Sequence, residues 1–85
     1  MSEKYQITGG QIAAALALLR LSQAELAKAA NVSVPTIGRM VASDGPAPGM
    51  ANNLAAIRAA LESAGVIFVE SNGEGPGVRL RKTKG

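Results

Sequence analysis

The sequence predicts a small, mainly α-helical domain that ends in a β-hairpin. Two capping boxes, at residues 8–11 and 22–25, indicate helix starts. Apolar residues recur at helical spacing until Gly65, after which their period changes from about 3.6 to about 2 residues, as is typical of strands. The 85 residues suffice for one domain. We divide it into a helical part, a hairpin and a basic tail, at residues 1–65, 66–81 and 82–85.

The first helix is expected to begin at Thr8, because Thr8 and Gln11 have the spacing of a capping box. Ile12, Leu16 and Leu19 recur at i, i+4 and i+7 and form its apolar side. The two glycines that follow Thr8 weaken the first turn, since glycine is a poor helix former.

The second helix is expected to begin at Ser22, where Glu25 completes a capping box, and to continue through Ala30. Leu26 is predicted to face the interior. Asn31 is expected to end this helix in the left-handed conformation, which asparagine adopts at a lower cost than most residues.

The third helix contains a proline that indicates its start. With Ser33 as the N-cap, Pro35 is the second helical residue, where its missing N–H has no partner to lose. We expect the inward side of this helix to be formed by Ile37 and by either Met40 or Val41.

The fourth helix is predicted over about Met50–Ala64. Leu54, Ile57 and Leu61 lie at i, i+3 and i+7 and form its apolar side. Gly65 follows at the position that commonly ends a helix in the left-handed conformation.

The C-terminal part is predicted to be a hairpin in which VIFVE and VRLR flank the turn-rich stretch SNGEGPG. Val66 and Phe68 share one face of the first strand, whereas Ile67 and Val69 share the other, so both faces are apolar. The hairpin either packs only on its own fourth helix or also pairs with a second copy of the chain. The second alternative predicts a dimer interface formed by Val66, Ile67, Phe68, Val69, Val78 and Leu80.

The composition argues against an enzyme. The chain has no Cys and no His, which removes thiol chemistry, the usual zinc ligands and the commonest general base. The carboxylates are scattered and lack the paired spacing that acid–base catalysis needs. We therefore expect no enzymatic activity, no metal site and no cofactor.

The same sequence predicts a cytoplasmic protein without a membrane segment. The longest apolar run, residues 12–19, is much shorter than the roughly 20 residues that cross a membrane. No basic segment or small-residue cleavage site accompanies this run, as would be expected for a signal peptide.

The net charge of +3 is concentrated at the C-terminal end. From Val78 onward the chain has four basic residues and no acidic one, whereas the rest has five basic and six acidic residues. Such an end either keeps the protein soluble or meets an acidic polymer such as DNA.

The stretch LSQAELAKAANVSVPTIGRM, residues 21–40, resembles the Xre family of helix-turn-helix regulators, to which the phage lambda cI and Cro repressors belong. The resemblance covers about residues 7–64, and the ending AGVIFVESNGEGPGVRLR is similar to that of small Xre-like regulators. Asn31 stands where the family usually has Gly, and Val41 where it often has Glu. The matching elements are Ser22-Gln23, Leu26-Ala27, Val32-Ser33 and Ile37.

The resemblance implies a lambda-repressor-like fold of four to five helices with a C-terminal hairpin, in which the helix after Ser33 enters the major groove. It places Val34, Pro35 and Arg39 at base-reading positions, with Thr36 beside them. Each could instead be an ordinary exposed or capping residue. Other positions are expected to contact the DNA backbone. Together with the base-reading positions, the residues expected to contact DNA are Gln23, Ser33, Val34, Pro35, Thr36, Arg39, Arg79, Arg81 and Lys82.

The function implied is sequence-specific binding of double-stranded DNA by a transcriptional regulator. A repressor that acts as a homodimer on an inverted-repeat operator is the simplest form. One alternative is the antitoxin of a toxin–antitoxin pair, which would also regulate its own expression and bind a toxin. Another is a protein-interaction module without DNA specificity.

Overall fold

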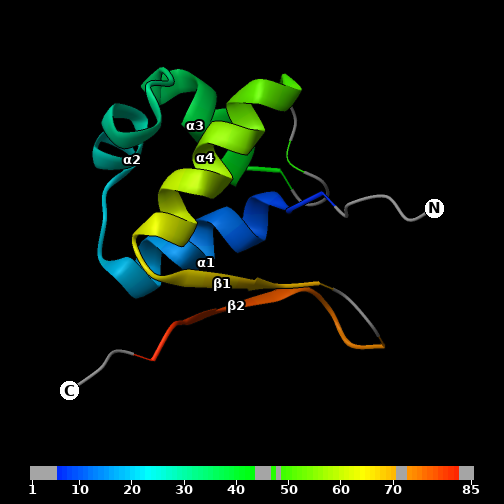
Figure 1. The fold of residues 1–85 in the computed structure, drawn as a ribbon. Coiled ribbons are helices and arrows are strands. Elements are labelled where there is room, and N and C mark those ends of the chain that lie inside the picture. The colour runs from blue at the N-terminus through cyan, green and yellow to red at the C-terminus, as the bar shows by residue number, and fades with distance from the viewer. Residues whose placement is uncertain (1–5, 44–46, 48, 71–72, 83–85) are drawn as a thin grey trace.

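The computed structural model describes residues 6–43, 47, 49–70 and 73–82. Within them the chain forms four helices and one antiparallel hairpin, as the sequence predicts. Figure 1 shows α2 and α3 at one end of the molecule, the hairpin at the opposite end, and α1 and α4 between them. Residues 83–85 of the predicted tail lie outside the described residues.

Both predicted capping boxes are present. In α1 (Gly9–Leu19), Thr8 Oγ1 accepts a hydrogen bond from the Gln11 N–H at 3.0 Å, and Gln11 Oε1 accepts one from the Thr8 N–H at 2.9 Å. Ser22 and Glu25 form the corresponding pair of hydrogen bonds at the start of α2 (Gln23–Ala30). Asn31 ends α2 in the left-handed conformation, with φ of 59°, which confirms its predicted role.

The third predicted helix is α3 (Val34–Val41). Ser33 is its N-cap and accepts a hydrogen bond from the Thr36 N–H, and Pro35 occupies the first turn. Of the two candidates for the inward side, Met40 is buried together with Ile37, whereas Val41 is half-buried at the edge of the core. Pro35 therefore marks a helix start in the structure, as its position in the sequence predicts.

The fourth helix, α4 (Ala51–Ser63), is one residue shorter at each end than predicted, because Met50 and Ala64 are its caps. Ile57 and Leu61 are fully buried, while Leu54 is only half-buried. Gly65 follows with φ of 116°, a conformation that favours glycine.

The hairpin pairs β1 (Val66–Val69) with β2 (Gly77–Leu80) and shares the core of the helices. β1 packs on α4 and β2 packs on α1, while α2 contacts both α3 and α4. Val66 and Phe68 are buried, so one core extends through the predicted helical part and the predicted hairpin. The largest fully buried side chains in this core are Ile12, Leu26, Ile37, Met40, Ile57, Leu61 and Val66.

Gln11 connects α1 to both strands, in addition to completing the capping box. Its side chain is 3% exposed, and its Nε2 donates hydrogen bonds to Val69 O at 3.1 Å and to Gly77 O at 3.0 Å. Because buried polar groups need partners, these bonds fix the hairpin against the start of α1.

Candidate nucleic-acid interface

The exposed surface of α2 and α3 contains the residues that the sequence singles out as base-reading. Ile37 and Met40 point into the core, which leaves the opposite side of α3 facing solvent. Val34, Pro35 and Arg39 are exposed on that side. Val34 is 44% exposed, which makes it one of the few large apolar side chains at the surface. An exposed apolar side chain and a cation on the same helix fit a partner that offers both methyl groups and hydrogen-bond acceptors.

The structure also brings Gln23 to this surface. A Cβ atom placed on Gly38 would lie 3.5 Å from Gln23 Oε1, an ordinary van der Waals distance. The Gln23 side chain, from the first turn of α2, therefore lies next to the middle of α3. The amide of Gln23 therefore lies on the same surface as the exposed α3 residues. From the sequence, this position of Gln23 is suggested only by the family resemblance.

Three polar side chains on α3 are joined by hydrogen bonds. The Arg39 guanidinium donates from Nη2 to Thr36 Oγ1 at 3.3 Å. Thr36 Oγ1 in turn lies 2.7 Å from Ser33 Oγ. These three predicted DNA-contacting residues thus form one connected group that spans the first two turns of α3.

A hollow of about 500 Å³ adjoins the turn between α2 and α3. Lys28, Ser33 and Val34 line it, together with Ala24, Ala27, Asn31 and Val32. From the sequence, Lys28 is an ordinary exposed charge. The left-handed turn at Asn31 folds α3 back beside the last turn of α2, and it thereby places the exposed Lys28 next to the predicted backbone-contacting Ser33. The sequence could have indicated this position of Lys28, because Lys28 lies in the last turn of α2, just before the left-handed residue Asn31.

The basic residues of the C-terminal end lie elsewhere. Arg79, Arg81 and Lys82 are exposed, and none of them forms an ion pair with another described residue. The hairpin that contains Arg79 is at the opposite end of the molecule from α2 and α3 (Figure 1). One protomer therefore does not bring these cations together with Arg39.

The predicted dimer residues divide between the two faces of the hairpin. Val66 and Phe68 are buried in the protomer's own core, so their side chains are not available to a second copy. Val78 and Leu80 pair with Phe68 and Val66 and thus share the helix-facing side, where Val78 packs on the core and Leu80 stays 46% exposed. On the outward face, Ile67 is half-buried and Val69 is 37% exposed.

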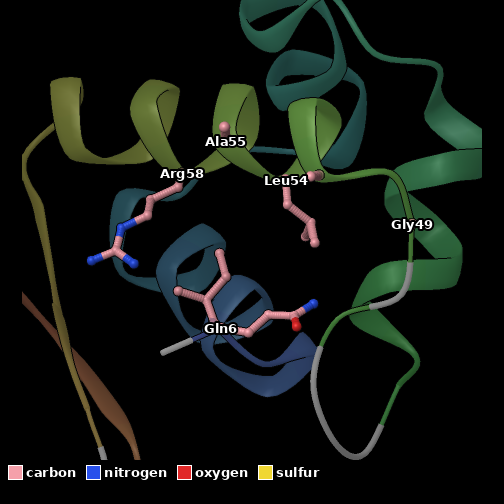
Figure 2. Close-up of a pocket in the computed structure, with 7 residues that line it drawn as sticks. Gln6, Gly49, Leu54, Ala55 and Arg58 are labelled. Carbon is pink, nitrogen blue, oxygen red and sulfur yellow. The ribbon is translucent and has the colours of Figure 1, made fainter. Parts of the chain in front are cut away.

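A second hollow, a groove of about 480 Å³, lies between α4 and the segment before α1. Figure 2 shows Leu54 and Gln6 on its two sides and Arg58 at one end. The polar groups are engaged within the protein: Gln6 Nε2 donates to Ala47 O at 2.8 Å, and Arg58 Nε pairs with Glu62 at 3.1 Å. The Arg58 guanidinium also lies 5.4 Å from the centre of the Phe68 ring. The described polar side chains that line this groove are thus already engaged within the protein, so the groove is a weak candidate for a polar ligand.

Among the described residues, no cluster of acidic side chains is arranged to hold a metal ion. No described helix is both long enough and apolar enough to cross a membrane. Neither a scan against protein-family models nor a search of curated proteins finds a match for this chain. The geometry of the α2–α3 surface is therefore the basis for assigning a function.

Proposed function

We propose that the protein is a sequence-specific DNA-binding regulator in which α2 and α3 form a helix-turn-helix of the lambda-repressor-like type. The observation that supports this most is the exposed side of α3, where Val34, Pro35 and Arg39 stand together with Gln23 beside them. In such proteins the second helix of the unit enters the major groove, and the first crosses the backbone. In this arrangement α3 is the recognition helix.

The side chains of α3 match the chemistry of base edges. Arg39 can donate two parallel hydrogen bonds to guanine O6 and N7, the commonest specific contact in the major groove. Val34 and Pro35 can meet the methyl group of thymine. Ser33, at the cap, and Gln23, on the first turn of α2, can donate hydrogen bonds to phosphate oxygens in this arrangement.

We propose further that the protein binds as a homodimer through its hairpins. Because the hairpin lies at the opposite end of the protomer from α2 and α3, two copies joined there leave both α3 surfaces uncovered (Figure 1). Exposed Val69 and half-buried Ile67 would supply apolar contacts, and the free strand edges would supply hydrogen bonds. A two-fold dimer of this kind reads an inverted repeat. Occlusion of a promoter, including the protein's own, is the simplest regulatory outcome.

Selection of bound duplexes from a random-sequence pool, at near-physiological salt, tests this proposal. We expect enrichment of an inverted repeat whose half-sites are about one helical turn apart. Val34→Glu is the matched control: glutamate suits the first turn of a helix, so the fold is retained, but its carboxylate opposes the negative DNA. This variant should enrich nothing. If the unmodified protein enriches no sequence either, the protein alone is not a specific regulator.

Arg79 pairs with Ile67 and thus shares the outward face of the hairpin, so in the proposed dimer we expect it at the rim of the interface, from which Arg79, Arg81 and Lys82 can reach the phosphates between the two half-sites. Changing Arg79, Arg81 and Lys82 to Gln should then weaken binding to all sequences alike. The slope of log affinity against log salt should fall by about 0.9 for each phosphate that the variant no longer neutralises. Substitution is a cleaner test than truncation, because Leu80 pairs with the buried Val66. A variant with the original salt slope would show that these cations do not meet phosphate.

An antitoxin is the second candidate function. It is favoured by the same exposed cations, together with the exposed Val69 on the outward face of the hairpin, which offer a protein partner a surface distant from α3. In that case a toxin encoded next to this protein should co-purify with it, and the complex should still bind the selected DNA.

A further inference from the structure

Thr36 occupies the centre of the connected polar group on α3. Its Oγ1 lies 3.3 Å from Arg39 Nη2 on one side and 2.7 Å from Ser33 Oγ on the other. The backbone N–H of Thr36 also donates to Ser33 Oγ at 3.3 Å. Thr36 is half-buried, whereas Ser33 and Arg39 are exposed. The two exposed residues therefore make contact only through Thr36.

The direction of one of these hydrogen bonds follows from the groups involved. A guanidinium only donates, so Thr36 Oγ1 must accept from Arg39. Between Thr36 Oγ1 and Ser33 Oγ either hydroxyl can be the donor. In both cases Ser33 Oγ accepts from the Thr36 backbone N–H. When Thr36 also donates its hydroxyl proton to Ser33, the proton of the Ser33 hydroxyl is left for an acceptor outside the protein.

We propose that Thr36 is a positioning residue that holds Arg39 in place for base contact and leaves Ser33 as a donor to a phosphate oxygen. This inference rests on the proposed DNA-binding function. An arginine side chain has several rotatable bonds, and ordering it on binding opposes association. Thr36 reduces that loss because it restricts Arg39 before DNA arrives. It also couples the base-reading residue to the backbone-contacting residue, so that the two should not act independently.

The first test needs no DNA. Thr36→Val keeps the β-branched shape but removes the hydroxyl, and Thr36→Ser restores a hydroxyl at the same position. The order parameter of the Arg39 Nε–Hε bond, measured by ¹⁵N relaxation, should fall in Thr36→Val and recover in Thr36→Ser. The thermal midpoints of both variants show whether the helix itself is intact. Equal order in the native protein and Thr36→Val would overturn the proposal.

The second test uses the selected operator and a double-mutant cycle. Thr36→Val should weaken binding about three- to tenfold, and the effect should shrink below about twofold when Arg39 is already alanine. The loss should be concentrated at the base pair that Arg39 reads, and Thr36→Ser should recover most of it. Equal losses on all sequences that persist in the Arg39→Ala background would mean that Thr36 contacts DNA itself and would overturn the positioning role. If no variant binds any DNA specifically, the proposed function fails, while the relaxation measurement alone decides whether Thr36 restrains Arg39.

Discussion

Replacing Gly9 by alanine is expected to lower the free energy of unfolding by about 2–3 kcal/mol. The start of α1 approaches the end of α3 so closely that a Cβ on Gly9 would overlap with Met40 O and lie 2.6 Å from Ser43 O. Both atoms belong to the backbone and cannot rotate away, so one helix must move. Domains of this size are stable by only about 5–15 kcal/mol, which makes such a loss large. Because α3 carries the proposed base-reading side chains, its displacement should also weaken DNA binding.

Gly10→Ala is the matched control for this prediction. A Cβ on Gly10 would meet only Thr8 Oγ1, at 3.8 Å, and the residue is exposed. Without a clash, alanine should raise the stability by about 0.4–1 kcal/mol, mainly because it restricts the unfolded chain. Urea unfolding followed by far-UV circular dichroism measures both variants, since the chain has no Trp to report by fluorescence. Equal stabilities for the two variants would contradict the close approach of α1 to α3.

The element boundaries were predictable because they depend on local chemistry. Capping hydrogen bonds join residues three apart, so Thr8 and Ser22 identify the starts of α1 and α2 from the sequence alone. The end of α1 was less visible. Arg20 ends this helix in the left-handed conformation, with φ of 58°, although arginine has no special preference for it. The next residue, Leu21, packs against the core, a long-range contact that the local sequence does not show.

Long-range contacts explain most of what the sequence did not reveal. From the sequence, Gly9 only weakens a helix, whereas in the fold it allows two helices to approach. From the sequence, Gln11 is a capping residue. The hydrogen bonds from its side-chain amide to the hairpin involve Val69 and Gly77, which lie 58 and 66 positions further along the chain. The burial of Val66 and Phe68 likewise depends on which face of the hairpin meets the helices. An alternating pattern that is apolar on both faces does not specify that choice.

The exposed side of α3 was predictable from the sequence, whereas the hydrogen bonds between its side chains were not. The pattern from Ser33 to Met40 indicates which side of α3 is buried, and the exposed residues follow by elimination. The hydrogen bond from Arg39 to Thr36 requires a particular side-chain rotamer, which periodicity does not determine. The proximity of Gln23 to Gly38 requires the packing angle between α2 and α3.

Arg39→Ala is expected to abolish the preference of the protein for one base pair in each half-site. Arg39 is exposed on the side of α3 opposite Ile37 and Met40, where a major groove would lie. A bidentate contact from arginine to guanine discriminates against other bases by about 1–3 kcal/mol, or roughly 5- to 150-fold in affinity. The loss should appear on the selected operator and be small on operators already changed at that base pair. Titrations against operators with single base-pair changes measure it.

Two further variants separate base reading from charge. Arg39→Lys keeps the positive charge but lacks the planar fork, so the salt slope should stay the same while the base preference falls. Arg79→Ala removes an equal charge at the opposite end of the protomer and should lower affinity to a similar degree for every sequence. An Arg39→Ala protein that retains the original preference at every base pair would show that Arg39 is only an exposed charge. Specificity would then have to arise from Val34 and Pro35, whose apolar contacts distinguish thymine but cannot select guanine.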